Sequence, residues 1–228
     1  VGKCSNCQVG DSKGLNIYLL YKFTSDEIGD FREFFEKTTG VKPWGAQEVW
    51  MYRLLNRENT VIIAPTGMGK TTLLIIYALY MAGYGKKTIY LTPTKALARQ
   101  VYDKIIEYMN RVREDYRVLI YDSSMSKNKR NQVLEAVKNS EFDILVATNN
   151  FFIKKHECIN PSSIDILIID DVDSLLKSDS NVKRLINLIG YSDQVLELLK
   201  EKYRILWKLS LSRALIDYYL LRKRLISM

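Results

Sequence analysis

The segment from Ala64 to Thr72 has the residue types needed to bind a triphosphate. Gly67 and Gly69 allow backbone N–H groups to turn inward around phosphate oxygens, and a helix that starts directly after them presents its positive end to the same anion. Lys70 can reach the β- and γ-phosphates, and the Thr71 hydroxyl can ligate Mg²⁺. The predicted contacts come from Ala64, Pro65, Thr66, Gly67, Met68, Gly69, Lys70, Thr71 and Thr72, with alanine at the first position, where this loop usually has glycine.

Three aspartates follow the apolar run Ile166–Ile169 and provide the second half of such a site. In open α/β sheets ligands bind at the carboxyl ends of the strands, which is where Asp170 is expected. We expect Asp170 to hold Mg²⁺ through a water and Asp171 to orient or deprotonate the attacking water. Alone, these acids could simply cap the next helix. The phosphate loop upstream favours the metal role.

Gln47 lies shortly before the phosphate loop, in the run Lys42–Gln47. A glutamine amide carries both a donor and an acceptor, so it can read the N6 and N7 edges of adenine. A glutamine on a helix is usually only solvated, and its place ahead of the loop is what favours the recognition role. Gln47 therefore predicts ATP rather than GTP as the nucleotide.

Two further segments have the residue types of phosphate-backbone contacts. A threonine hydroxyl, a lysine and helix N–H groups meet at Pro93, Thr94 and Lys95, and a second loop end carries Thr148 and Asn149, with Lys154 and Lys155 just beyond it. Contacts of this kind position a nucleic-acid backbone and do not specify its sequence. Taken singly, they would be ordinary loop ends. Their order relative to the phosphate loop and the acidic strand favours the interpretation as nucleic-acid contacts.

The candidate residues need strands and helices to hold them in position, and short, nearly continuous apolar runs predict the strands. Five runs read as strands buried on both faces of a parallel sheet: Thr60–Ala64, Thr88–Thr92, Arg117–Tyr121, Asp143–Ala147 and Ile166–Asp170. Between the second and third runs, Lys95–Val112 places Leu97, Val101, Ile105, Tyr108 and Val112 on one helical stripe. Alternating strands and helices predict an α/β fold with a parallel sheet flanked by helices.

Composition limits the function classes further. The 228 residues are 47% hydrophobic and 26% charged, which is typical of a globular protein, and the net charge of +8 favours a polyanionic partner. Three cysteines exclude a disulfide scaffold and fit a reducing compartment. With no membrane-spanning run or signal peptide, we expect a cytoplasmic monomer without a membrane partner. Only five glutamines beside many charged residues suggest a thermophile.

The two ends of the chain differ from this core. Residues 1–29 read as irregular and contain Cys4 and Cys7 at the knuckle spacing of a zinc ribbon, but a tetrahedral zinc site needs four ligands. His156 and Cys158 are the other candidates and read as ordinary loop residues. Residues 192–228 lack strand signals and read as a helical extension, with a nucleic-acid-facing helix as the alternative. The predicted domains are 1–29, 30–191 and 192–228.

In their order along residues 40–180, these motifs resemble the first motor lobe of superfamily 2 helicases, which implies a RecA-like lobe. Within that group the chain looks most like reverse gyrase, because Asp171-Val172-Asp173 stands where RNA helicases have Glu-Ala-Asp. Lys42–Gln47, Ala64–Thr72 and the N-terminal cysteine pair support the same resemblance. The resemblance implies an ATP-dependent type IA DNA topoisomerase that introduces positive supercoils. It also implies that Asp173 contributes to the nucleotide site, that DNA is the partner, and that Cys4 and Cys7 are half a zinc site.

Some family features are not visible in the sequence, namely the serine-alanine-threonine coupling motif, the second motor lobe and the topoisomerase module. The chain is therefore expected to be part of a larger enzyme, with residues 192–228 entering a helical insertion. Two other functions stay open. One is an RNA helicase lobe of the DEAD-box kind; the other is a non-enzymatic, nucleotide-gated DNA-binding fragment.

Overall fold

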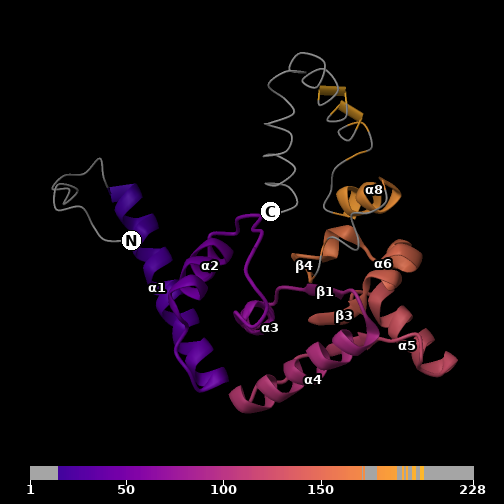
Figure 1. Ribbon diagram of the computed structural model, residues 1–228, viewed down its shortest axis with the longest axis horizontal. Coiled ribbons are helices and arrows are strands. Elements are labelled where there is room, and N and C mark those ends of the chain that lie inside the picture. The colour runs from indigo at the N-terminus through magenta and orange to yellow at the C-terminus, as the bar shows by residue number, and fades with distance from the viewer. Residues whose placement is uncertain are drawn as a thin grey trace. The chain divides into compact units, whose positions relative to one another are not determined.

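A computed structural model describes residues 15–170, 172, 179–188, 192, 194, 197–198 and 201–202 of the chain (Figure 1). Its contacts divide the chain into two compact units, Val1–Thr60 and Val61–Met228. The predicted domain boundaries after residues 29 and 191 stay predictions. The phosphate loop, the sheet and both predicted nucleic-acid segments belong to the second unit, whereas Gln47 belongs to the first.

The first unit is a pair of helices, α1 (Leu15–Thr39) and α2 (Gly45–Leu55), which contact each other. Phe31, Phe35 and Thr38 are fully buried at helical spacing on α1. The prediction of an irregular segment up to residue 29 is therefore wrong from Leu15 onward. Gly29 reads as a break in the sequence, but the buried side chains on the last turns and the absence of proline allow the helix to continue through it.

Four parallel strands form the sheet of the second unit, in the order β2-β3-β1-β4. They agree with four of the predicted runs to within one residue at each end, and the predicted α/β fold is confirmed. Burial explains the agreement, since every residue of β1 and β3 is buried, as continuous apolar runs require. The strands are β1 (Thr88–Thr92), β2 (Val118–Tyr121), β3 (Ile144–Thr148) and β4 (Ile166–Ile169).

Helices cover both faces of this sheet (Figure 1). On one face, Ile89, Leu91 and Leu145 pack in a single core with Val137 of α5 and Phe152 of α6. The alternate strand residues, Tyr90 among them, point to the opposite face, where α3 and α4 contact each other and the strands. The helical elements are α3 (Lys70–Ala82), α4 (Lys95–Val112), α5 (Lys127–Lys138), α6 (Asn149–Lys155), η2 (His156–Cys158), η3 (Pro161–Ser163) and α8 (Asp179–Leu188).

The predicted strand Thr60–Ala64 is the main departure from the expected sheet. These residues are not in a strand, and among the described strands β4 pairs with β1 alone. Val61 and Ile63 are 47% and 57% exposed. β-branched residues favour a strand only where a neighbouring strand accepts their hydrogen bonds, and the segment has no such neighbour in the described part of the chain.

None of the helices described here has the length and apolar character to cross a bilayer. Most of residues 192–228, predicted as a helical extension, lie outside the described residues. Their predicted nucleic-acid-facing alternative therefore stays a prediction.

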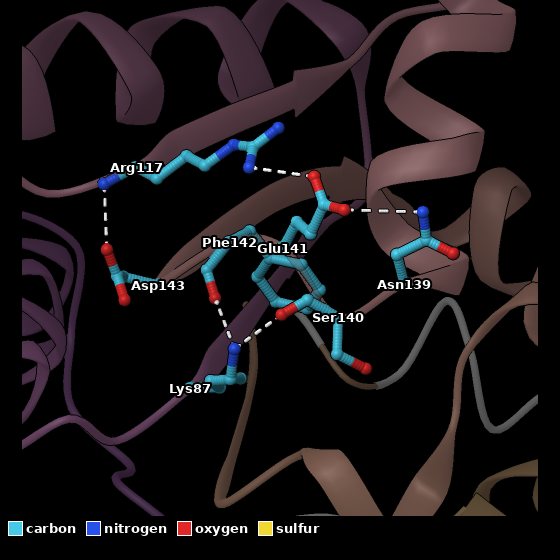
Figure 2. A network of polar contacts seen from close by, with 7 residues as sticks. All are labelled: Lys87, Arg117, Asn139, Ser140, Glu141, Phe142 and Asp143. Atoms are coloured by element: carbon cyan, nitrogen blue, oxygen red, sulfur yellow. Dashed lines mark hydrogen bonds and ion pairs between the residues drawn. The ribbon is translucent and has the colours of Figure 1, made fainter.

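A polar network fixes the amino ends of the strands, at the sheet edge away from the phosphate loop (Figure 2). The Lys87 ammonium, just before β1, donates hydrogen bonds to the carbonyl oxygens of Ser140 and Phe142, the latter at 3.3 Å. Arg117, just before β2, pairs with Glu141 at 2.9 Å. Because these contacts join the starts of three strands, they hold the sheet in register.

Replacing Lys87 by methionine is expected to lower the free energy of unfolding by about 1–2 kcal/mol, because two carbonyl oxygens lose a charged donor. Differential scanning calorimetry would show a melting temperature lower by roughly 2–8 °C. Lys86→Met is the matched control, since the Lys86–Asp165 pair is over one third exposed and is expected to contribute under about 1 kcal/mol. Equal losses for both variants would contradict the role of Lys87.

Candidate functional site

The loop between Ala64 and Lys70 has the backbone geometry of an anion cradle. Gly67 and Gly69 have φ angles of 83° and 76°, in the left-handed region that glycine adopts without strain. Gly69 directly precedes α3 as its N-cap residue and has no side chain that could cap the helix. The loop and the helix start can therefore offer backbone N–H groups to an anion. Pro65, Thr66 and Gly67 are exposed, while Ala64, Met68, Gly69, Lys70, Thr71 and Thr72 are partly exposed.

Lys70 begins α3 and folds back over the loop. Its ammonium donates hydrogen bonds to the carbonyl oxygens of Ala64 and Pro65, the latter at 2.9 Å. The charge is thus held at the mouth of the loop by oxygen atoms of the loop itself. Phosphate oxygens could take the place of these carbonyls without a large movement of the side chain.

Thr71 and Asp170, which are 99 positions apart in sequence, come together at the same sheet edge. The Thr71 hydroxyl donates to the Asp170 carboxylate at 3.4 Å. Asp170 follows β4, and its backbone N–H donates to Leu91 of β1 at 2.9 Å, which fixes its position at the carboxyl end of the strand. A hydroxyl and a carboxylate are hard oxygen donors of the kind that Mg²⁺ takes, so these residues fit that ion.

Asp171, Asp173 and Gln47 are the remaining residues predicted for the nucleotide site. Asp171 and Asp173 lie outside the described residues. Gln47 is 5% exposed in α2, where its side-chain oxygen accepts a hydrogen bond from the Trp44 backbone N–H at 3.2 Å. This contact holds the amide group at the helix start through its carbonyl oxygen. Recognition of adenine by Gln47 stays a prediction.

The first predicted nucleic-acid segment lies where β1 leads into α4. Thr94 caps α4 by accepting a hydrogen bond from the Leu97 backbone N–H at 3.2 Å. Thr94 and Lys95 are exposed and Pro93 is partly exposed. The hydroxyl of Thr94 is engaged in the cap, so Lys95 is the exposed cation at this helix start.

The second segment differs from the expected loop. Thr148 is the last residue of β3, and α6 begins at Asn149 without a loop between them. Thr148 accepts a hydrogen bond from the Phe151 backbone N–H, and the two side chains of Thr148 and Asn149 are only 9% and 6% exposed. Because the helix starts at once, these side chains turn inward, while Lys154 and Lys155 at its other end are exposed.

Asp122 is a residue that the sequence reasoning missed. It follows β2, is 3% exposed, and accepts hydrogen bonds from the Arg99 guanidinium at 2.6 Å and from the Ser124 backbone N–H at 2.8 Å. Burial raises the pKa of this carboxyl, but the bonds from Ser124 and Arg99 outweigh burial and hold the pKa below its usual value. The signal in the sequence was an acid directly after an apolar strand, the partly buried β2.

Of the four zinc candidates, only two belong to the described residues. Cys4 and Cys7 lie outside the described residues, and His156 and Cys158 lie in the short helix η2, where the His156 ring packs 6.1 Å from the Phe152 ring. Within the part of the chain that is described, no three histidine, cysteine or acidic side chains gather as metal ligands. Zinc binding therefore has no support from these residues.

Comparison with known proteins adds independent information. The profile of the DEAD/DEAH box helicase family matches residues 44–207. The chain is 39% identical over 168 residues to the reverse gyrase of Pyrobaculum aerophilum, which covers 73% of this chain and 14% of that protein. It is 38% identical over 179 residues to reverse gyrase 2 of Aquifex aeolicus, covering 78% of this chain and 15% of that protein.

Similarity of structure points the same way. A crystal structure of a hypothetical ATP-dependent RNA helicase from Sulfolobus tokodaii superimposes with a TM-score of 0.55 and 26% identity, covering 69% of this chain and 47% of that one. The chain thus spans about half of that structure and about one seventh of these two reverse gyrases.

Proposed function

The chain belongs to the DEAD/DEAH box helicase family, and we propose that it is the ATP-binding motor lobe of a reverse gyrase. The lobe would bind ATP with Mg²⁺ and contact the backbone of DNA. The parent enzyme would be an ATP-dependent type IA topoisomerase that introduces positive supercoils. Similarity to reverse gyrases over three quarters of this chain supports this choice over an RNA helicase lobe.

One contact carries the nucleotide-binding part of the proposal. The Thr71 hydroxyl and the Asp170 carboxylate lie 3.4 Å apart although they belong to segments distant in sequence. This pair stands at the start of α3, beside a loop with two glycines of positive φ. Backbone N–H groups for phosphates and oxygen donors for a divalent cation thus lie next to each other, as ATP–Mg²⁺ requires.

The chain's own residues would divide the work as follows. Loop N–H groups would bind the phosphates, and the Lys70 ammonium would exchange its two carbonyl partners for phosphate oxygens. Thr71 and Asp170 would hold Mg²⁺, which when bound neutralises charge on the β- and γ-phosphates. Asp171 would orient the attacking water, Asp173 would support the nucleotide site, and Gln47 would read adenine.

DNA binding would use the carboxyl edge of the sheet. Lys95 stands exposed at the start of α4, and Lys127 and Lys129 stand exposed at the start of α5. These cations lie at the ends of β1 and β2, on the sheet edge that also carries the phosphate loop. A backbone-contacting mode of this kind has no sequence preference and depends on salt.

Calorimetric titration of ATP into the chain, with Mg²⁺ and with excess EDTA, tests the nucleotide part. Binding that strengthens with Mg²⁺ and prefers ATP to GTP is the expected result. The absence of any ATP binding at millimolar nucleotide would refute the proposed function.

A salt titration tests the DNA part. Affinity for duplex DNA is expected to fall linearly on a log–log plot of binding constant against salt, and Lys95→Ala should reduce the slope by about 1, because one phosphate contact is lost. Fluorescence anisotropy with labelled duplex DNA, single-stranded DNA and single-stranded RNA measures this. Salt-independent binding would contradict the backbone mode, and a clear preference for RNA would favour the RNA helicase alternative.

A further inference from the structure

Tyr90 is a buried polar residue that the proposed function does not use. It lies at the centre of β1, paired with Val146 of β3 and Ile168 of β4, and its side chain is 0% exposed. Its hydroxyl is also buried, and no hydrogen-bond partner for it is found among the described residues. A buried hydroxyl without a partner is unfavourable, so such groups in folded proteins usually have a role that explains them.

The direction of the Tyr90 side chain places it beside the magnesium residues. Its neighbours in β1, Ile89 and Leu91, pack into the core on the α5 and α6 face, so Tyr90 points to the face that carries α3. Thr71 is in the first turn of α3, and Asp170 continues β4 next to the end of β1. The phenol therefore lies on the face of the sheet that carries Thr71 and Asp170.

The surroundings of the phenol agree with this placement. Ile168 of β4 is the register partner of Tyr90, and Asp170 follows Ile168 by two residues, so the Asp170 and Tyr90 side chains belong to the same face of the sheet. The Thr71 hydroxyl of α3 donates to the Asp170 carboxylate at 3.4 Å on that face. A phenol hydroxyl is a hydrogen-bond donor, and a carboxylate is an acceptor.

We propose that Tyr90 is a positioning residue of the magnesium site, whose hydroxyl donates a hydrogen bond to the Asp170 carboxylate when the cation is bound. This inference rests on the proposed binding of ATP–Mg²⁺ at Thr71 and Asp170. A carboxylate that holds a cation needs its remaining lone pairs fixed by donors, and such outer partners set the orientation of the ligand. Tyr90 would provide that donor from its buried position at the centre of β1.

Replacement by phenylalanine tests the hydroxyl alone, because the ring that fills the core is kept. Binding of a fluorescent ATP analogue is followed while Mg²⁺ is titrated. For Tyr90→Phe, the Mg²⁺ concentration at half-maximal binding is expected to rise about tenfold. Affinity for the analogue in excess EDTA and the melting temperature should stay within error of the unmodified chain, since neither depends on the proposed bond.

The matched control is Tyr80→Phe, which removes a hydroxyl from the far end of α3 that pairs with the Tyr84 hydroxyl at 3.1 Å. Its Mg²⁺ dependence should be unchanged. A double variant, Tyr90→Phe with Asp170→Asn, should need no more Mg²⁺ than Asp170→Asn alone, because the acceptor is already lost.

Two outcomes would overturn the inference and are distinguishable from each other. If the unmodified chain bound the ATP analogue in a Mg²⁺-dependent way and Tyr90→Phe had the same Mg²⁺ dependence, the Tyr90 hydroxyl would have no role in the magnesium site. If the unmodified chain itself showed no Mg²⁺-dependent binding, the proposed function would fail, and the role of Tyr90 with it.

Discussion

Lys70→Ala is expected to weaken the binding of ATP–Mg²⁺ by about 10- to 100-fold. A hydrogen bond from a charged group contributes about 1.5–3 kcal/mol, and a tenfold change in affinity corresponds to about 1.4 kcal/mol. Lys70 is held at the mouth of the loop by the carbonyls of Ala64 and Pro65, so its ammonium already lies where phosphate oxygens would arrive. Isothermal titration calorimetry with ATP measures the effect.

Stability has to be separated from affinity for this variant. Because Lys70 also bridges two carbonyls of its own loop, its loss can loosen the loop without nucleotide, and the melting temperature of the nucleotide-free chain reports that part. Lys95→Ala is the matched control, an exposed lysine at the start of another helix of the same lobe. It should weaken DNA binding and leave ATP binding unchanged. Equal ATP affinity for Lys70→Ala and the unmodified chain would remove Lys70 from the phosphate site.

The sheet could be predicted because burial leaves a simple signal in sequence. Strands covered by helices on both faces read as unbroken apolar runs, and Thr88–Thr92 coincides with β1 at both ends. The stripe of α4 was predicted for the same reason, since Val101, Ile105, Tyr108 and Val112 are buried at helical spacing. The assignment to a helicase-like lobe rested on the order of motifs, and the family match over residues 44–207 confirms it.

Other features depend on partners that a local pattern does not reveal. Val61 and Ile63 have strand-forming side chains, but no described strand pairs with this segment. Thr148 and Asn149 turn inward because α6 follows β3 without a loop. The position at which a strand ends and a helix begins cannot be predicted to the residue from the sequence pattern. Thr71 and Asp170 are far apart in sequence, yet both were predicted for one magnesium site, and they lie in contact. The prediction was possible because ligand-binding residues of open α/β sheets gather at the carboxyl ends of the strands.

The pairing of Arg99 with Asp122 is a contact that the sequence pattern did not predict. Both residues were visible in the sequence, yet nothing in their spacing of 23 positions indicates contact. Their meeting follows from the crossover that brings α4 back beside β2. Asp122 thereby fixes Arg99 and the turn at Ser124 at the edge of the sheet proposed to face DNA. Removing its carboxylate should lower the free energy of unfolding of the lobe.

Asp122→Ala is expected to lower the free energy of unfolding by about 1–3 kcal/mol at neutral pH. The carboxylate accepts bonds from the Arg99 guanidinium and the Ser124 backbone N–H in a position that is 4% exposed on its side chain, so alanine leaves these donors without their acceptor. Urea unfolding followed by circular dichroism gives the value. Asp103→Ala, an exposed aspartate on the same helix as Arg99, should change stability by less than about 0.5 kcal/mol.

The contribution of Asp122 should also depend on pH in a defined direction. Its pKa in the folded chain lies below the unfolded value of about 3.9, because the bonds from Ser124 and Arg99 outweigh burial. The folded state therefore binds the proton less readily, and the stability from this carboxylate is present above about pH 4 and is lost as the pH falls through the folded pKa. Asp165, whose pKa is lowered by its bonds to Lys87 and Lys86 despite burial, adds to the same acid sensitivity.

Comparing the unmodified chain with Asp122→Asn isolates this group, because Asp165 is present in both and cancels in the difference. Asparagine keeps the shape of the side chain and an acceptor oxygen but removes the titration. The difference in unfolding free energy should be largest near pH 6–7 and should shrink as the pH falls from about 4 toward 3. A difference that stayed constant over this interval would mean that Asp122 acts only through its shape, and that its charge does not hold Arg99 at the sheet edge.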